Sequence, residues 1–367
     1  MSKILFLVNH DVVIYNFRLE LVERLLHDGH EVAISSPYGE RIDDLVKLGC
    51  EYHKIDISRH GMNPAKEIRL INEYKRLIKD TRPDIVLTYT IKPNVYGGMA
   101  CTSLGIPCVA NVTGLGTAIE NGGIKQFITV CMYKIGLRRT EKVFFQNTKN
   151  MDFFETHRIA LGKHDLIPGS GVNLNRNPFE DYPKDTGEYV FLFIGRLMKD
   201  KGFEELVQAA KRITEQYSNI KFEAVGFCEA DYEKELEKIG SEQYITLFGQ
   251  QRNVHEYIKR CHAVILPSYH EGMANVLLEA AASGRPVLAS DIPGCRETFD
   301  EDISGIGFKP RDVDSLCEAI EKFIALPYEK KAEMGRAGRA KMEREFDRKI
   351  VVDKYMEIVN EIERGEK

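Results

Sequence analysis

The chain has 367 residues, of which 43% are hydrophobic and 29% are charged, and its formal net charge is −5. These values exclude a disordered or fibrous chain, and at ~100–200 residues per domain the length favours two domains. The negative charge argues against nucleic acid as the main partner. No apolar run approaches the ~18–20 residues needed to span a bilayer, and residues 1–8 predict a buried strand rather than a secretory signal.

The eight cysteines are scattered along the chain and form no Cys-x-x-Cys pair. A disulfide framework or a structural zinc site would require clustered cysteines. We therefore expect reduced, mostly buried thiols in a cytoplasmic protein.

Short apolar runs alternate with amphipathic stretches from one end of the chain to the other. In the first half, predicted strands lie at residues 4–8, 31–35, 84–87, 107–111 and 142–145, and helical patterns at 15–27 and 63–79. In the second half, predicted strands lie at 189–194, 220–225, 244–248, 263–266 and 286–289, and helical patterns at 203–216 and 313–324. Several runs are apolar on both faces, which is typical of parallel strands covered by helices on both sides. The alternation predicts a doubly wound α/β fold.

This alternation occurs twice, and a stretch rich in Gly, Pro, Asn and Asp separates the two series. We predict two Rossmann-like domains facing a cleft, with boundaries at 1–170 and 187–345, a linker at 171–186 and a final helix at 346–367. Ligands of open α/β sheets bind beyond the carboxyl ends of the strands. The loops after the strands are therefore the places to look for a site.

The first such loop follows the predicted strand at 189–194 and contains Gly195, Arg196 and Lys201. The glycine allows the backbone to turn, and two cations in one loop suit a diphosphate, because a guanidinium binds it as a fork and an ammonium as a point charge. The alternative is that both cations are solvated surface charges.

A second loop contains Glu271 and Gly272 and leads into a helix that is expected to begin near Ala274. The free amides of such a helix start form an anion site. Glu279 follows Glu271 by eight residues, which is up to ~12 Å along a helix at 1.5 Å per residue. A carboxylate binds vicinal hydroxyls in pairs, so two at this spacing suit a nucleotide-sugar. The alternatives are an ordinary acidic residue near a helix N-terminus for Glu271 and a surface pair with Arg285 for Glu279.

The combined pattern of Arg196-x4-Lys201 and Glu271-x7-Glu279 resembles the GT-B glycosyltransferases of family 4. These are retaining enzymes, many of which build capsule, lipopolysaccharide or lipid-linked oligosaccharides. The resemblance implies that Glu271 binds donor-sugar hydroxyls, that Glu279 binds the ribose, and that the two cations stabilise the departing diphosphate. It also implies an acceptor-binding first domain, a donor-binding second domain and a final helix that crosses back to brace the first. Further donor contacts are expected at Gly195, Gly249, Gln250, Asn253, Gly272, Met273, Ala274 and Asn275.

The first domain departs from the family pattern in two loops. The loop at 9–18 lacks the glycines that approach the donor phosphates in relatives, and Ile91 stands where many relatives have a histidine near the reacting sugar. Because isoleucine cannot hydrogen-bond through its side chain, the contact that this histidine makes near the reacting sugar is lost or moves to Thr90 or Lys92. Candidate acceptor contacts are His10, Asn16, Arg18, Thr90, Lys92 and Thr113, the last from a glycine-containing loop at 111–117. For the residues of the first loop, an ordinary surface position stays an open alternative.

Residues 125–145 interleave apolar side chains with basic ones, among them Lys134, Arg138 and Arg139. A basic amphipathic helix can lie in the headgroup plane of an anionic membrane, and the alternative is a core-packed helix with solvated lysines. A lipid-linked acceptor would favour the membrane interpretation. From the sequence alone the core-packed helix is slightly favoured, so we expect a cytoplasmic protein, with a peripheral position at the inner face of the cytoplasmic membrane if its acceptor is lipid-linked.

Metal binding looks unnecessary. The motif Asp312-Val-Asp314 is better explained as a helix N-cap followed by a first-turn acid than as a metal-binding Asp-x-Asp. Arg196, Lys201 and a helix N-terminus supply positive potential, so we expect neither a metal nor a cofactor.

Together with the family resemblance, these patterns predict a retaining glycosyltransferase. Its donor would be a nucleotide-diphosphate hexose or N-acetylhexosamine, with uridine as the base on family grounds, and its acceptor a hydroxyl of a lipid-linked saccharide. Two alternatives stay open. One is a nucleotide-sugar epimerase on the same fold, which needs acid–base residues around the sugar. The other is a non-catalytic donor-binding subunit, which only Ile91 favours.

Overall fold

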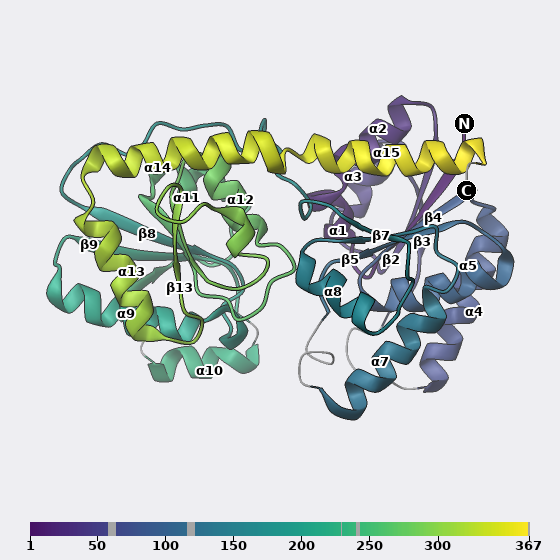
Figure 1. Cartoon of the computed structure of the whole chain (residues 1–367), viewed down its shortest axis with the longest axis horizontal. Helices are drawn as coiled ribbons and strands as arrows, with labels where there is room; N and C mark the ends of the chain where they lie inside the picture. The colour runs from purple at the N-terminus through teal and green to yellow at the C-terminus, as the bar shows by residue number, and fades with distance from the viewer. Residues whose placement is uncertain (58–63, 116–121, 229, 240–242, 366–367) are drawn as a thin grey trace. The chain divides into compact units, whose positions relative to one another are not determined.

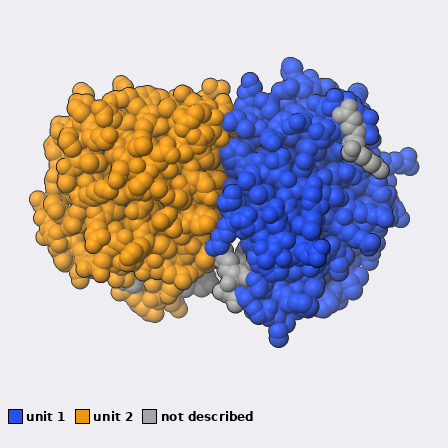
Figure 2. Space-filling view, in the orientation of Figure 1, with its two compact units in different colours: residues 1–170, 349–367 blue, residues 171–348 orange. Residues whose placement is uncertain are grey.

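The computed structural model describes residues 1–57, 64–115, 122–228, 230–239 and 243–365 (Figure 1). The chain divides into two compact units, residues 1–170 with 349–367 and residues 171–348 (Figure 2). Each unit is a parallel sheet with covering helices, so the predicted class of two Rossmann-like, doubly wound α/β domains is confirmed. Residues 171–186, expected as a linker, are counted with the second unit.

The first unit contains a seven-stranded sheet in the order β3-β2-β1-β4-β5-β6-β7, in which every neighbouring pair is parallel. Its strands are β1 (Lys3–Leu7), β2 (Glu31–Ser36), β3 (Glu51–Lys54), β4 (Ile85–Tyr89), β5 (Cys108–Val112), β6 (Lys142–Phe145) and β7 (His164–Leu166). Its helices are α1 (Asp11–Phe17), α2 (Leu19–His27), α3 (Ile42–Lys47), α4 (Pro64–Thr81), the π-helical η1 (Pro93–Gly97), α5 (Gly98–Leu104), α7 (Gly123–Gly136), α8 (Thr148–Thr156) and α15 (Arg348–Arg364). The strand order reverses between β1 and β4, which is where ligands of such sheets bind.

Alternate side chains of β1 enter two different cores. Ile4 and Phe6 pack with α1, α2 and α15 on one face, whereas Leu5 and Leu7 pack with α4, α5 and α7 on the other. Successive side chains of a strand point to opposite faces, so this division is the direct result of an all-apolar strand between two helical layers. The final helix α15 thus forms part of the first unit's core.

The second unit contains a six-stranded parallel sheet in the order β10-β9-β8-β11-β12-β13. Its strands are β8 (Tyr189–Ile194), β9 (Ile220–Val225), β10 (Ile245–Leu247), β11 (Ala263–Leu266), β12 (Val287–Ser290) and β13 (Gly305–Phe308). Its helices are η2 (Lys199–Lys201), α9 (Phe203–Gln216), α10 (Ala230–Ile239), α11 (His255–Arg260), α12 (Asn275–Ala282), η4 (Arg296–Thr298), α13 (Val313–Ala325), α14 (Tyr328–Lys341) and η5 (Met342–Phe346). Here the order reverses between β8 and β11.

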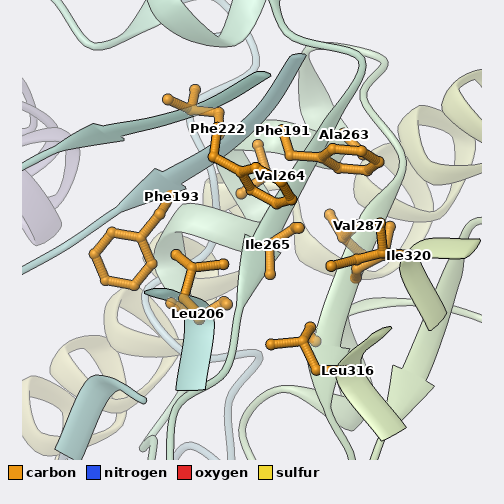
Figure 3. Close-up of a cluster of buried hydrophobic side chains, with 14 of the residues drawn as sticks. Phe191, Phe193, Leu206, Phe222, Ala263, Val264, Ile265, Val287, Leu316 and Ile320 are labelled. Carbon is orange, nitrogen blue, oxygen red and sulfur yellow. The ribbon is translucent and has the colours of Figure 1, made fainter. Parts of the chain in front are cut away.

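The core of the second unit joins its central strands to α9 and α13, which lie side by side (Figure 1). Figure 3 shows Phe191 and Val264 from neighbouring strands packed with Leu206 of α9 and Leu316 of α13. At the start of α13, the Asp312 carboxylate accepts a hydrogen bond from the Ser315 amide at 3.0 Å, which confirms the predicted N-cap.

The eight cysteines are free thiols, and five of them are buried, as expected from their spacing. Within the described ranges, none of the helices combines the length and the hydropathy that crossing a bilayer requires.

Candidate active site

The central feature of the second unit is an ion pair at the point where its strand order reverses. Lys201, in the turn after β8, donates a hydrogen bond from its ammonium group to the carboxylate of Glu271, in the loop after β11. Ser268 donates from its hydroxyl to the same carboxylate oxygen at 2.7 Å. The strands β8 and β11 are parallel neighbours, so their loops leave the same edge of the sheet. The structure therefore brings together two of the three residues predicted to be catalytic.

Close backbone packing holds this pair in place. Gly202 has a φ of +66°, and a Cβ atom there would lie 2.0 Å from the carbonyl oxygen of Pro267. A Cβ atom on Gly294, in the loop after β12, would lie 2.6 Å from the carbonyl oxygen of Glu271. The amide of Ala274 donates to the carbonyl of Gly294 at 2.7 Å. Both glycines allow an approach between loops that a side chain would prevent.

Arg196, the third predicted catalytic residue, is exposed near the start of the same loop. Gly195 beside it packs against Gly226, where a Cβ atom would lie 1.7 Å from the Gly195 carbonyl oxygen. The amide of Gly226 in turn donates to the carbonyl of Gly249 at 2.9 Å. The loops after β8, β9 and β10 are thus joined by their backbones. Two further predicted donor contacts, Gln250 and Asn253, are exposed in the last of these loops.

The helix α12 begins directly after the Glu271 loop. Gly272 is half-buried, and Met273 and Ala274 are buried against the unit. Ala274 is the N-cap and offers no side-chain hydrogen bond to the first turn. The Asn275 side chain donates to the Met273 carbonyl at 3.4 Å, while its buried Oδ1 has no hydrogen-bond partner in the described part of the chain. The start of α12 therefore has no side-chain cap, but the amides of Asn275 and Leu277 donate to the carbonyls of Met273 and Ala274 at 3.0 Å and 2.9 Å. What this helix start offers an anion is chiefly the positive end of its dipole.

Glu279 lies in the second turn of α12 and is half-buried. Burial raises the pKa of its carboxyl to about 7, and the positive charge of Arg348 acts in the opposite direction. Arg285 is fully buried and donates only to backbone carbonyls, including those of Ile258 at 3.0 Å and Lys259 at 2.7 Å. The alternative interpretation of Glu279 as a surface partner of Arg285 is therefore wrong.

In the first unit, the loop after β1 places polar groups where that sheet reverses. His10 is the N-cap of α1 and accepts a hydrogen bond from the Val12 amide at 3.2 Å. Asp11 is buried and accepts from the Arg41 amide at 2.8 Å. The sequence analysis did not single out Asp11, because its burial depends on the distant loop that follows β2. Asn16 is exposed on α1.

Arg18 occupies an environment that its position in the sequence does not indicate. Its side chain is 2% exposed, and its guanidinium lies 5.2 Å from the ring centre of Tyr89 and 5.5 Å from that of Tyr355. It donates to the Phe17 carbonyl at 2.6 Å. The structure thus places this candidate acceptor contact between β4 and α15 rather than on the surface.

The loop after β4 contains the remaining candidates of the first unit. Thr90 has a φ of +70°, and its buried hydroxyl has no hydrogen-bond partner in the described ranges. Lys92 forms an ion pair with Glu67 of α4 at 2.7 Å. Ile91 packs against the core, and Thr113 is half-buried after β5. The end of the predicted loop at 111–117 lies outside the described residues.

A polar network that the sequence analysis missed connects these strand ends. Thr88 donates to the side chain of Asn94 at 2.8 Å, and Asn94 donates to the backbone carbonyl of Asn111 at 2.8 Å. Asn111 donates to the hydroxyl of Tyr355 at 2.9 Å.

A groove of about 830 Å³ also lies between β3 and α4, with Lys92 and Glu67 in its wall. In the described ranges, no three His, Cys, Asp or Glu side chains come together as metal ligands.

Two protein families match this chain, one on each unit. The model described as glycosyl transferase 4-like matches residues 3–147, and the model described as glycosyl transferases group 1 matches residues 175–341. The second match contains the Lys201–Glu271 pair and Glu279. Both models describe glycosyltransferases, so the chain is a glycosyltransferase, and its second unit matches the group 1 glycosyltransferases.

This glycosyltransferase is 24% identical over 378 residues to the N,N'-diacetylbacillosaminyl-diphospho-undecaprenol alpha-1,3-N-acetylgalactosaminyltransferase of Campylobacter jejuni, with 98% of this chain and 99% of the relative covered. It is 26% identical over 308 residues to the UDP-Gal:alpha-D-GlcNAc-diphosphoundecaprenol alpha-1,3-galactosyltransferase of Escherichia coli, with 78% and 77% covered. A solved structure of Anabaena Alr3699/HepE in complex with UDP and glucose matches with a TM-score of 0.79 at 17% identity, over 98% of this chain and 100% of the other. With the two parallel sheets, this likeness identifies the GT-B fold.

Proposed function

We propose that this glycosyltransferase is a retaining, metal-independent enzyme that moves a hexose or N-acetylhexosamine from a UDP-sugar to a hydroxyl of a lipid-linked saccharide. The observation that carries the proposal is the Lys201–Glu271 pair beside the uncapped start of α12. The name of the E. coli relative contains a UDP-sugar, and the HepE structure contains UDP. Both named relatives act on saccharides joined to diphosphoundecaprenol, which supports a lipid-linked acceptor.

The chemistry depends on stabilising the leaving group. An ammonium has three N–H donors, so the contact of Lys201 with Glu271 leaves capacity for phosphate oxygens. Arg196 and the first amides of α12 add positive potential near the same place. The bond between the anomeric carbon and the diphosphate oxygen breaks, and a bond to the acceptor oxygen forms on the same face of the sugar. The proton of the acceptor hydroxyl passes to the departing diphosphate.

Glu271 has two tasks in this scheme. Its carboxylate accepts hydrogen bonds from Lys201 and Ser268, which fixes the ammonium in the loop. One carboxylate offers about four lone-pair sites, so capacity remains for a sugar hydroxyl. Because cationic side chains and a helix N-terminus supply the positive charge, we infer that no divalent ion is needed. Activity that is unchanged by EDTA would support this inference, and activity restored only by added Mg²⁺ would contradict it.

We also propose that α7 contacts an anionic membrane. Ile124, Phe127, Ile128 and Ile135 are 80%, 69%, 41% and 58% exposed, and their spacing places them on one side of the helix. We call these four side chains the α7 stripe. Lys134, Arg138 and Arg139 are exposed at the end of the same helix and just after it. An exposed apolar stripe flanked by cations suits the headgroup region of an anionic bilayer.

The same helix also has a packed side. Tyr133 and Leu137 are fully buried in the first unit's core, and Met132 is half-buried against it. The two alternatives drawn from the sequence therefore describe different sides of one segment. The packed side anchors α7 in the first unit, and the α7 stripe stays exposed on the other side of the helix, where it can contact the membrane.

An assay of nucleotide-diphosphate release tests the proposed reaction. The chain is incubated with a panel of UDP-sugars, with and without a polyprenyl-diphosphate-linked saccharide. Release that requires the acceptor supports transfer. Isomerisation of the nucleotide-sugar without release would indicate the epimerase, and binding without turnover would indicate a donor-binding subunit.

A further inference from the structure

Phe227 is an exposed aromatic side chain at the carboxyl end of β9. It is 44% exposed, whereas Val225, the last residue of the strand, is buried in the core. Two aromatic side chains of the neighbouring segment, Phe248 and Tyr257, contact each other with ring centres 5.0 Å apart, and Arg260 lies over both rings. Within the described ranges, Phe227 has no such ring or cation partner. A large apolar ring is thus uncovered at this strand end.

Phe227 lies directly beside Arg196, on the neighbouring strand end. The last residues of β8 and β9 are paired in parallel register, and one further parallel bridge joins Leu197 to Cys228. Two residues separate these pairs on each strand, so Arg196 is opposite Phe227. The Leu197 amide donates to the Phe227 carbonyl at 2.9 Å, as this register requires. Paired residues share a face and neighbouring strands are ~4.8 Å apart, so the ring begins about one strand spacing from the cation proposed to meet the diphosphate.

The backbone that carries Phe227 is fixed on both sides. A Cβ atom on Gly226 would lie 1.7 Å from the carbonyl oxygen of Gly195, so no side chain fits between the loops after β8 and β9. On the other side, the Gly226 amide donates to the carbonyl of Gly249 at 2.9 Å. Gly195 and Gly249 are both expected donor contacts. Phe227 is therefore held between two loops that are expected to bind the donor, and its backbone is ordered before a ligand arrives.

The proposed site accounts for three of the four parts of a nucleotide-sugar. Glu271 is assigned to the sugar and Glu279 to the ribose. Arg196 and Lys201 are assigned to the diphosphate. No side chain is yet assigned to the base, which is a planar group with two apolar faces. Aromatic rings stack on such faces, and stacking removes apolar area of both groups from water.

We propose that Phe227 stacks on the base of the bound nucleotide and is the base-binding side chain of the donor site. This inference rests on the proposed function, which makes the donor a nucleotide-sugar. Every nucleobase presents a π-face, so a stacked ring adds affinity without selecting one base. Phe227 thus strengthens binding of the nucleoside part of the donor and contributes nothing to binding of the diphosphate.

A fluorescence titration of the full chain tests the stacking directly. The chain contains no tryptophan, so Phe227→Trp introduces a single indole fluorophore. We expect UDP and uridine to quench its emission, because an indole stacks on a base as a phenyl ring does. Inorganic pyrophosphate, which has no base, is expected to leave the emission unchanged.

The matched control is Phe179→Trp. The Phe179 side chain is 43% exposed, almost as much as that of Phe227, and it lies against Gly284. Gly284 precedes β12, so this control is near the amino ends of the strands, at the opposite edge of the sheet. UDP should not alter its emission.

Calorimetric titration measures what the ring contributes to affinity. Phe227→Ala is expected to weaken UDP binding by about 5-fold to 150-fold, the range that corresponds to the loss of one aromatic–base stack. Its affinity for pyrophosphate should equal that of the wild type. Phe227→Tyr keeps a ring and is expected to bind UDP normally, whereas Phe227→Leu keeps only an apolar side chain and should recover little of the loss. Because Phe227 is exposed, each variant should melt at the wild-type temperature.

Three results would overturn this inference and leave the proposed function standing. The first is a folded Phe227→Ala variant that binds UDP as tightly as the wild type. The second is an unchanged emission of Phe227→Trp at saturating UDP. The third is an equal loss of affinity for UDP and for pyrophosphate, which would show that Phe227 acts on the diphosphate contacts rather than on the base. Wild-type protein that binds neither UDP nor UDP-glucose would overturn the proposed donor, and this inference with it.

Discussion

Lys201 and Glu271 are seventy residues apart in the sequence and are joined by a hydrogen bond between ammonium and carboxylate. Their side chains are 23% and 12% exposed, so the pair is partly shielded from water yet still accessible. Charges in such an environment interact more strongly than they do on an open surface. The hydrogen bond to Glu271 orients the ammonium that is expected to meet the diphosphate.

Replacement of Lys201 by alanine tests its catalytic role. We expect kcat to fall by about 10²–10³-fold, the usual cost of removing one group that stabilises a developing negative charge. The matched control is Lys199→Ala in the same turn, because Lys199 is exposed and only weakly associated with Glu204 at 3.9 Å. Steady-state release of the nucleotide diphosphate measures both variants. Equal rates for the two variants would remove Lys201 from the mechanism.

Among the buried cations of the second unit, Arg285 is expected to contribute most to its stability. Its donors satisfy carbonyls of the segment at 180–181, of α11 and of residues 283–284, which directly follow α12. We expect Arg285→Met to lower stability by about 3 kcal/mol or more, because several buried carbonyls lose their partners. The control is Arg336→Met, which changes an exposed arginine of α14. Calorimetric unfolding should separate the two variants, and a similar melting temperature for both would contradict this account.

His262 makes the stability of the second unit depend on pH. Burial, followed by the charges of Arg285 and Lys331, lowers its pKa to about 4 from the usual 6.5, and its ring accepts a hydrogen bond from the Val190 amide at 3.0 Å. Below pH 6.5 the unfolded chain binds a proton that the folded chain does not, so stability is complete above that pH and is lost as the pH falls towards 4. By pH 5 the loss should reach about 2 kcal/mol.

The measurement is the melting temperature between pH 8 and pH 5. In His262→Gln the decrease on acidification is expected to be smaller, because the amide oxygen can accept the same hydrogen bond without titrating. His27→Gln serves as the control, since the His27 side chain is 85% exposed. If His262→Gln and the wild type decline in parallel, the titration of His262 does not contribute to acid sensitivity.

The α7 stripe should govern binding to vesicles that contain anionic lipid. Ile124→Ser combined with Phe127→Ser removes apolar area from the stripe and is expected to weaken binding at every salt concentration. Arg138→Gln combined with Arg139→Gln is expected to weaken binding most at low salt, because added ions screen the lost attraction. Ile68→Ser is the control, because Ile68 is 61% exposed on a different helix, α4. Vesicle co-sedimentation in which both double variants behave like the wild type and the Ile68→Ser control would argue for another partner.

The sequence predicted the central strands of both sheets but missed three edge strands. β3 (Glu51–Lys54) and β7 (His164–Leu166) lie at the edges of their sheet, and neither has a fully buried residue. β13 (Gly305–Phe308) contains two glycines, which weaken any periodic pattern. Hydrophobic patterning identifies a strand only where burial requires apolar side chains.

The candidate site was predictable where a residue's position depends only on the strand that precedes it in the sequence. Lys201 lies seven residues after β8 and Glu271 five residues after β11, so a strand–loop pattern is sufficient to place both at one edge. Arg18 differs, because its burial depends on rings from β4 and α15 that are distant in the sequence. The packing of η5 against α12 is equally invisible in the sequence.

The most direct test of the central claim is a crystal structure of this glycosyltransferase with bound UDP. We expect the diphosphate within hydrogen-bond distance of the Lys201 ammonium and of the first amides of α12, and the ribose hydroxyls at the Glu279 carboxylate. A nucleotide bound elsewhere, with Lys201 and Glu279 directed away from it, would contradict the account.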